Sequence, residues 1–171
     1  MAKIETPRLY LTELSEADMP DLRAILQDGQ TMYAYEGAFS EDETRKWLDK
    51  QLSNYERCGY GLWAAVLKED NRMIGDCGLT WQSIEDMSVL EVGYHFNRAF
   101  WHNGYAAEAA KACVRYAFEV LGHDEAYAIV RDTNLASMNV AIRCGMTAKR
   151  RFIKHYRGVD MPHIAFSIKR L

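Results

Sequence analysis

The sequence lacks the features that mark several classes of protein. Its four cysteines lie far apart and form no C-x-x-C pair, so neither a disulfide framework nor a zinc site is expected, and a reducing compartment is the plain interpretation. No run of about 18 apolar residues occurs, which argues against a transmembrane helix. The N-terminus has no apolar signal core, so we expect a cytoplasmic protein with no membrane partner.

The sequence also lacks an excess of positive charge, linker segments and histidines spaced as metal ligands. The formal net charge is −3, which gives no electrostatic reason to expect a nucleic-acid partner. Only three prolines occur, and there is no low-complexity stretch or repeat, so the 171 residues are most simply one domain, 1–171. The five histidines are not spaced as metal ligands, and we expect no bound metal.

Two common phosphate-binding motifs are missing. No Gly-Lys-Ser/Thr follows a glycine-rich turn, which excludes a P-loop, and G-x-G-x-x-G is absent, which argues against a Rossmann fold. The segment Glu91–Leu121 offers a different strand–turn–helix unit. Strand-forming residues alternate in its first part, and apolar residues recur three and four apart in its last part.

The turn of this unit, Trp101–Ala106, is a candidate phosphate site. Gly104 permits a tight backbone bend there. The first turn of the following helix has unpaired N–H groups and a partial positive charge. We therefore predict that the turn binds a phosphate, although a simple strand-to-helix connection would have the same local sequence.

The remaining pattern predicts a mixed α/β fold. In chain order we expect a strand, two helices, three antiparallel strands, a helix, a strand, a helix and two closing strands, at 8–14, 15–29, 40–59, 60–68, 73–84, 90–96, 105–121, 125–131, 134–144, 149–155 and 163–168. Gly75 and Gly78 predict a bulge or a close backbone approach. Strand, helix and strand from Glu91 to Arg131 imply a right-handed parallel crossover in a mostly antiparallel sheet, which opens the sheet where a ligand can enter.

Four stretches are similar to those of a known family. They are E-T-P-R-L-Y-L at 5–11, E-V-G-Y-H-F at 91–96, W-H-N-G-Y-A-A-E-A at 101–109 and N-L-A-S-M-N-V-A-I-R-C-G-M at 134–146. Together they resemble the GNAT acyltransferases, and most closely the ribosomal-protein N-acetyltransferase-like (RimJ/RimL-like) branch. The resemblance covers essentially the whole chain and implies a GNAT fold, in which helices flank a central, mostly antiparallel sheet.

The resemblance also implies acetyl-CoA as donor and assigns residues to it. Backbone groups of Tyr94, His95 and Phe96 would pair with the pantetheine amides. The pyrophosphate would be held by backbone N–H groups of His102, Asn103, Gly104, Tyr105 and Ala106. Asn134 and Asn139 would hold the pantetheine arm, and Ser137 would give a proton to the departing thiolate. Asn134 and Ser137 could equally be helix caps.

Two departures from the family pattern affect the catalytic residues. A tyrosine that many members use as general acid is replaced by Ala141, which leaves Ser137 or water for that role. The carboxylate that the branch uses as base has no clear counterpart. Glu91 is the best candidate base, acting through a water, unless it is only a charge on the strand surface. His95 would lie beside the thioester.

The predicted activity is transfer of acetyl from acetyl-CoA to a primary amine. The amine would belong to a peptide or protein N-terminus or to a small molecule, and it would attack directly in a ternary complex. The alternatives are a non-catalytic CoA-binding module and an enzyme that uses a longer acyl-CoA. Aromatic residues after the first helix would form either core or the wall of the acceptor pocket: Tyr33, Tyr35 and Phe39, with Trp81. A homodimer is one assembly that the sequence allows.

Overall fold

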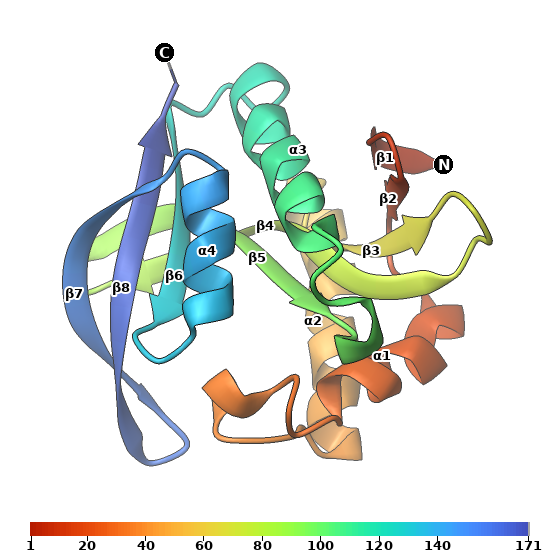
Figure 1. The fold of residues 1–171 in the computed structure, drawn as a ribbon, viewed down its shortest axis with the longest axis horizontal. Helices are drawn as coiled ribbons and strands as arrows, with labels where there is room; N and C mark the ends of the chain where they lie inside the picture. Colours follow the sequence, from red (N-terminus) through yellow and green to blue (C-terminus); the bar gives the residue numbers. More distant parts are fainter. Residues whose placement is uncertain (171) are drawn as a thin grey trace.

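One mixed sheet runs through the computed structural model, which describes residues 1–170 (Figure 1). Its eight strands lie in the order β1-β2-β3-β4-β5-β6-β8-β7. Their bounds are β1 Ala2–Glu5, β2 Leu9–Thr12, β3 Leu62–Leu67, β4 Met73–Ile84, β5 Met87–Phe96, β6 Glu125–Arg131, β7 Thr147–Tyr156 and β8 Val159–Lys169. Every neighbouring pair is antiparallel except β5 and β6. The predicted fold class is confirmed.

Helices cover both faces of the sheet. Their bounds are α1 Met19–Leu26, α2 Glu41–Cys58, α3 Tyr105–Glu119 and α4 Leu135–Arg143, with short 3₁₀ turns at Glu16–Asp18, Tyr33–Tyr35 and Arg98–Phe100. The apolar stripes of α1 and α2 pack together in one core. α3 and α4 pack in a second core on the opposite face, in front of the sheet in Figure 1. The two cores lie on opposite faces of the sheet, and the same strands contribute side chains to both, because successive residues of a strand face opposite ways.

The ends of α2 follow directly from its sequence. The Ser40 hydroxyl accepts the Glu43 N–H, and the Glu43 carboxylate accepts the Ser40 N–H. This reciprocal pair satisfies two donors that the helix cannot satisfy itself. Gly59 ends the helix at φ 78°, a left-handed conformation that favours glycine.

Backbones approach closely where β4 crosses its neighbours. A Cβ at Gly78 would lie 2.0 Å from the Gly61 carbonyl oxygen, and one at Gly75 would lie 2.4 Å from the His95 carbonyl oxygen. The β3–β4 register also shifts beside Gly75. The predicted bulge or close approach is therefore present, and no side chain fits at either glycine.

The sheet opens between β5 and β6. These parallel strands share one register pair, Glu91 with Tyr127, and beyond it they diverge. Helix α4 lies in front of the divergence in Figure 1, beside the C-terminal part of β5. The predicted opening at a parallel crossover is confirmed.

Some predicted boundaries were wrong. The strand predicted at 8–14 is only β2, and β1 before it was not predicted. β1 has four residues and is held by its pairing with β2, so it has little periodicity of its own. α1 ends at Leu26 rather than near Gly29, and β7 and β8 extend almost to their connecting turn.

Candidate active site

The predicted phosphate turn has an unusual backbone. His102 and Gly104 both have left-handed φ angles, 64° and 81°. Gly104 is the N-cap of α3, and the helix begins at Tyr105. Alternating right- and left-handed residues before a helix turn successive N–H groups toward one point, and such a concavity binds anions. A histidine in the left-handed region costs conformational energy, and residues strained in this way are often found at functional sites.

Side chains from distant parts of the chain hold this turn. The Glu108 carboxylate accepts hydrogen bonds from Arg8 Nε at 2.7 Å and from the Thr6 hydroxyl at 2.6 Å. Arg8 Nη1 also donates to the Asn103 carbonyl oxygen at 3.0 Å. Partial burial opposes a low pKa of Glu108, but the Thr6 and Arg8 hydrogen bonds dominate and lower that pKa. An ionised Glu108 thus fixes α3 and its N-terminal turn against the first strands.

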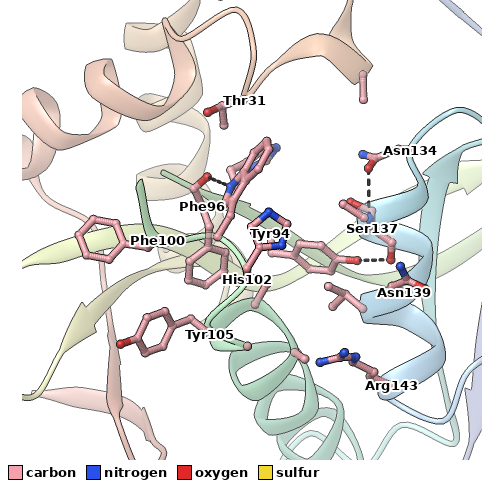
Figure 2. A pocket seen from close by; sticks show the side chains of 18 of the residues that line it. Thr31, Tyr94, Phe96, Phe100, His102, Tyr105, Asn134, Ser137, Asn139 and Arg143 are labelled. Atoms are coloured by element: carbon pink, nitrogen blue, oxygen red, sulfur yellow. Dashed lines mark hydrogen bonds between the residues drawn. The ribbon is translucent and has the colours of Figure 1, made fainter. Parts of the chain in front are cut away.

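A cavity of about 520 Å³ lies in front of the turn. It runs between the end of β5, the N-terminus of α3 and helix α4 (Figure 2). Its volume is that of a typical small-molecule or cofactor site. Its walls include every predicted cofactor residue except Asn103: Tyr94, His95, Phe96, His102, Gly104, Tyr105, Ala106, Asn134 and Asn139. Asn103 instead braces the turn, because its side-chain amide donates to the carbonyls of Phe100 and Trp101.

The end of β5 offers backbone groups to this cavity. The Asn97 N–H donates to the Ile74 carbonyl of β4. Hydrogen bonding alternates along an antiparallel pair, so His95 also turns its backbone toward β4, whereas Tyr94 and Phe96 turn theirs toward the opening. The Phe96 carbonyl accepts from Trp101 Nε1 at 2.7 Å. The prediction that backbone groups of His95 face the donor is therefore wrong, because the strand turns them toward β4.

Asn134 and Ser137 form the opposite wall. Asn134 is the N-cap of α4, and its Oδ1 accepts from the Ser137 N–H at 3.1 Å and from the Tyr33 hydroxyl at 2.7 Å. The Tyr94 hydroxyl donates to the Ser137 carbonyl at 2.9 Å (Figure 2). The helix-cap interpretation of Asn134 is confirmed. These bonds use the Asn134 Oδ1 atom and the Ser137 backbone N–H, and both residues line the cavity.

A second cavity of about 100 Å³ meets the first where the sheet opens. Five residues line both cavities: Ala34, Tyr35, Tyr94, Asn134 and Ser137. Glu91 lines only the second one. Burial raises the pKa of Glu91, and the positive charge of Lys154 and the Ile129 backbone partly oppose that shift. The smaller cavity is therefore lined by a carboxyl group, that of Glu91.

A family model described as "Acetyltransferase (GNAT) domain" matches residues 8–147. The chain belongs to the GNAT acetyltransferases. The family match and the acetyl coenzyme A-dependent relative named below show that the protein is an acetyl-CoA-dependent acetyltransferase.

Named relatives span nearly the whole chain. The Bacillus subtilis (strain 168) protein YkkB is 36% identical over 84% of each chain. The FsC-acetyl coenzyme A-N(2)-transacetylase of Aspergillus fumigatus is 37% identical over 98% of this chain and 76% of its own. RimL, a ribosomal L7/L12 α-N-protein acetyltransferase solved in complex with coenzyme A, shares the fold with TM-score 0.74 at 19% identity, over 96% of this chain and 95% of that chain. The predicted likeness to the RimL fold is thereby confirmed.

Several residues at the site had no decisive signal in the sequence. Arg8 and Arg143 belong to the site, Arg8 at the turn and Arg143 on the cavity wall. Arg8 lies about a hundred positions from its partner Glu108, so no local pattern could connect them. Of the four aromatic residues, Tyr33 and Tyr35 line the cavities, and Phe39 is in the core. Trp81 is 46% exposed and donates to the Tyr60 hydroxyl.

Residues 1–170 contain neither a membrane-spanning helix nor a cluster of metal ligands. No helix in that range combines the length and apolar character needed to cross a bilayer. No three histidine, cysteine or acidic side chains in it gather as metal ligands would.

Proposed function

We propose that the protein transfers the acetyl group of acetyl-CoA to a primary amine. The observation that carries this proposal is the meeting of two unequal cavities where the sheet opens. The larger one has the helix N-terminus and free strand backbone suited to CoA. The smaller one has a carboxylate, Glu91, suited to attract an ammonium group. The reacting carbon would lie between them, near Tyr94.

The reaction requires one bond to form and one to break. The neutral amine nitrogen attacks the acetyl carbonyl carbon, the new C–N bond forms, and the C–S bond breaks to release CoA as a thiolate. The nitrogen, which carries two protons when it attacks, gives up one of them to solvent and keeps the other as the amide N–H. Ser137, which lines both cavities, donates its hydroxyl proton to the thiolate and recovers one from solvent. Because a thiolate is a tolerable leaving group, positioning supplies much of the rate.

Glu91 has two roles compatible with its place in the smaller cavity. It can hold the ammonium form of the acceptor by charge, or take its proton through a water. Replacement by glutamine distinguishes the roles, because lost binding raises KM for the amine and lost proton transfer lowers kcat.

The acceptor class follows from the relatives' names. The Aspergillus relative is named for N(2)-acetylation of FsC, and RimL for α-N-acetylation of a ribosomal protein. A cavity of about 100 Å³ admits a narrow amine-bearing end in either case. Substrates carrying an unhindered primary amine, on a small molecule or at a peptide N-terminus, are therefore the class to test, with the cytoplasm as the expected compartment.

The test is release of free CoA thiol from acetyl-CoA by the purified protein. The panel would contain small-molecule amines and short peptides with free N-termini, each compared with its N-blocked form. We expect thiol release with at least one free amine and none with its blocked form. If the protein binds acetyl-CoA but releases no thiol with any amine, a CoA-binding module is the correct interpretation. Faster reaction with a longer acyl-CoA would overturn acetyl as the natural group.

A further inference from the structure

Three side chains form a hydrogen-bonded chain beside the junction of the cavities. The Tyr35 hydroxyl lies 2.8 Å from His95 Nε2, and His95 Nδ1 lies 2.8 Å from Asp76 Oδ1. The three come from the 3₁₀ turn Tyr33–Tyr35, from β5 and from β4. His95 and Asp76 face each other directly across the two strands, so the sheet itself fixes their spacing.

The chemistry of the groups sets the direction of the chain. Asp76 is completely buried, and an ionised carboxylate only accepts hydrogen bonds. His95 therefore carries its proton on Nδ1 and presents a bare Nε2. That nitrogen accepts the Tyr35 O–H. The phenolic oxygen keeps its lone pairs free to accept a proton from elsewhere.

Aromatic rings pack around this hydrogen-bonded chain of side chains, which ends where the two cavities meet. Trp47 packs edge-on against His95 at a ring distance of 5.1 Å, and Phe39 and Tyr156 pack edge-on against Tyr35 at 5.9 and 6.2 Å. Tyr35 lines both cavities, whereas Asp76 lines neither. The chain thus leads from a buried carboxylate to the place where donor and acceptor would meet.

Asp76 is hard to explain as a stabilising residue. Within residues 1–170, its buried Oδ2 has no hydrogen-bond partner. A buried carboxylate with an unsatisfied oxygen destabilises a fold unless its charge is needed. Its other oxygen, Oδ1, lies 2.8 Å from His95 Nδ1 and would pair with an imidazolium formed during the reaction. This is the arrangement expected if His95 must hold a proton during turnover.

We propose that Tyr35, His95 and Asp76 form the relay that removes the proton from the acceptor amine. The Tyr35 oxygen takes a proton from the ammonium nitrogen as the Tyr35 hydroxyl proton passes to His95 Nε2. The amine is then neutral and attacks the thioester. The imidazolium, paired with the Asp76 carboxylate, returns its proton to solvent after the product leaves.

This assignment rests on the proposed amine acetylation and leaves to Glu91 the attraction of the ammonium. Gly93 lies between Glu91 and His95 on the same face of β5 and has no side chain. A Cβ there would lie 4.0 Å from a Glu91 carboxylate oxygen. The nearest atom to that position is the Leu62 methyl carbon Cδ2 at 3.3 Å, so no side chain of β5 itself separates the carboxylate from the relay.

Burial and nearby negative charges keep the Tyr35 hydroxyl protonated between turnovers. Burial raises the pKa of Tyr35, and the charges of Glu91 and Asp76 raise it further, with Tyr156 and Tyr94 adding to the effect. Lys154 also borders the second cavity. A standing phenolate is thus disfavoured, and the two proton transfers must be concerted. This matches a hydroxyl that donates to His95 at rest.

The first test is Tyr35→Phe, which removes the hydroxyl and keeps the ring. With an amine that the wild-type protein acetylates, kcat should fall about 100-fold or more, with KM for acetyl-CoA essentially unchanged. The matched control is Tyr60→Phe, which breaks the 2.8 Å bond from Trp81 Nε1 outside both cavities and should keep wild-type kcat. A wild-type kcat for Tyr35→Phe would overturn the relay.

The second test separates proton transfer from structural support. In Asp76→Asn the carboxylate that lies 2.8 Å from His95 Nδ1 is gone, so kcat should fall while KM for the amine stays near the wild-type value. Glu91→Gln should instead raise KM for the amine and keep kcat. If Glu91→Gln lowers kcat and Asp76→Asn does not, Glu91 is the base and the relay is refuted.

Failure of the two proposals can be told apart. If the wild-type protein releases no thiol with any amine, the proposed function fails. If it acetylates an amine and Tyr35→Phe and His95→Gln do so at the same rate, only the relay fails.

Discussion

Gly104→Val tests the phosphate turn most directly. Gly104 has φ 81° and ψ 6° at the N-cap of α3. A Cβ there would lie 3.7 Å from Arg8 Nη2, an ordinary contact, so the substitution meets no steric block from its surroundings. The cost comes from the backbone itself, since a residue with a Cβ pays about 1–2 kcal/mol in the left-handed region and a β-branched residue pays more.

The effect on CoA affinity can be worked out from that strain. The chain relieves it by rotating residue 104, which turns the adjacent N–H groups away from the pyrophosphate position. Each hydrogen bond to a charged group contributes about 1.5–3 kcal/mol. Loss of two of them would cost about 3–6 kcal/mol, or a rise in Kd of roughly 10²- to 10⁴-fold.

The control is another left-handed glycine. Gly122 has φ 72°, with no atom within 4 Å of its Cβ position, and it follows the C-terminal end of α3. Gly122→Val carries a similar strain away from the cavity, so it should lose similar stability but keep its affinity for acetyl-CoA. Gly104→Asn should lose less affinity than Gly104→Val, because asparagine tolerates the left-handed region.

Isothermal titration with acetyl-CoA, together with urea unfolding of each variant, measures both effects. The reasoning is refuted if Gly104→Val binds acetyl-CoA with the wild-type Kd. It is also refuted if Gly122→Val loses as much affinity, because the loss would then reflect general instability.

Three further predictions concern single side chains. Ser137→Ala keeps the backbone cap to Asn134 and should lower kcat about tenfold or more with unchanged acetyl-CoA Kd; an unchanged kcat removes its role as acid. Burial raises the pKa of Glu91 in the folded state, so the stability that Glu91 contributes is fully present below its pKa in the unfolded chain and is lost as pH rises from there through the raised folded-state pKa. Glu91→Gln should therefore unfold at a higher temperature than wild type near neutral pH and match it at acid pH; equal melting at both would contradict the shift. Glu108→Gln replaces the oxygen that accepts from Arg8 Nε by an NH₂ group and removes the charge, although one oxygen can still accept from Thr6. It should cost about 1–2 kcal/mol in urea unfolding and weaken acetyl-CoA binding. Wild-type affinity would show that the turn does not depend on the Arg8–Glu108 pair.

Local patterns were sufficient to predict much of this molecule. The reciprocal Ser40–Glu43 cap and the left-handed Gly59 bound α2 where the sequence placed them. Alternation along β5 and the glycine before α3 located the turn. These features depend on residues a few positions apart, and their physics is contained in the segment itself.

The side chains of the proposed relay could not be brought together from the sequence in the same way. Asp76 lies in an apolar strand whose neighbours predict only burial, and its partner His95 is 19 positions away. Tyr35, 60 positions from His95, lies in an irregular segment with no periodicity. The pairing register of β4 and β5 brings Asp76 and His95 together, and the packing of the turn Tyr33–Tyr35 adds Tyr35. Both register and packing are properties of the assembled fold.

In the proposed mechanism, the alternation of β5 would let one strand serve both substrates. Tyr94 and Phe96 turn their backbone toward the donor cavity and their side chains toward α3 and α4. Glu91 and His95 turn their side chains to the other face, where Tyr35 and Trp47 lie. Donor contacts and proton-handling groups thus alternate along one backbone. A strand cannot rotate one residue without its neighbours, so the pleat of β5 would set the position of the thioester relative to His95. The turn that carries Tyr35 would then add the last group of the proposed relay.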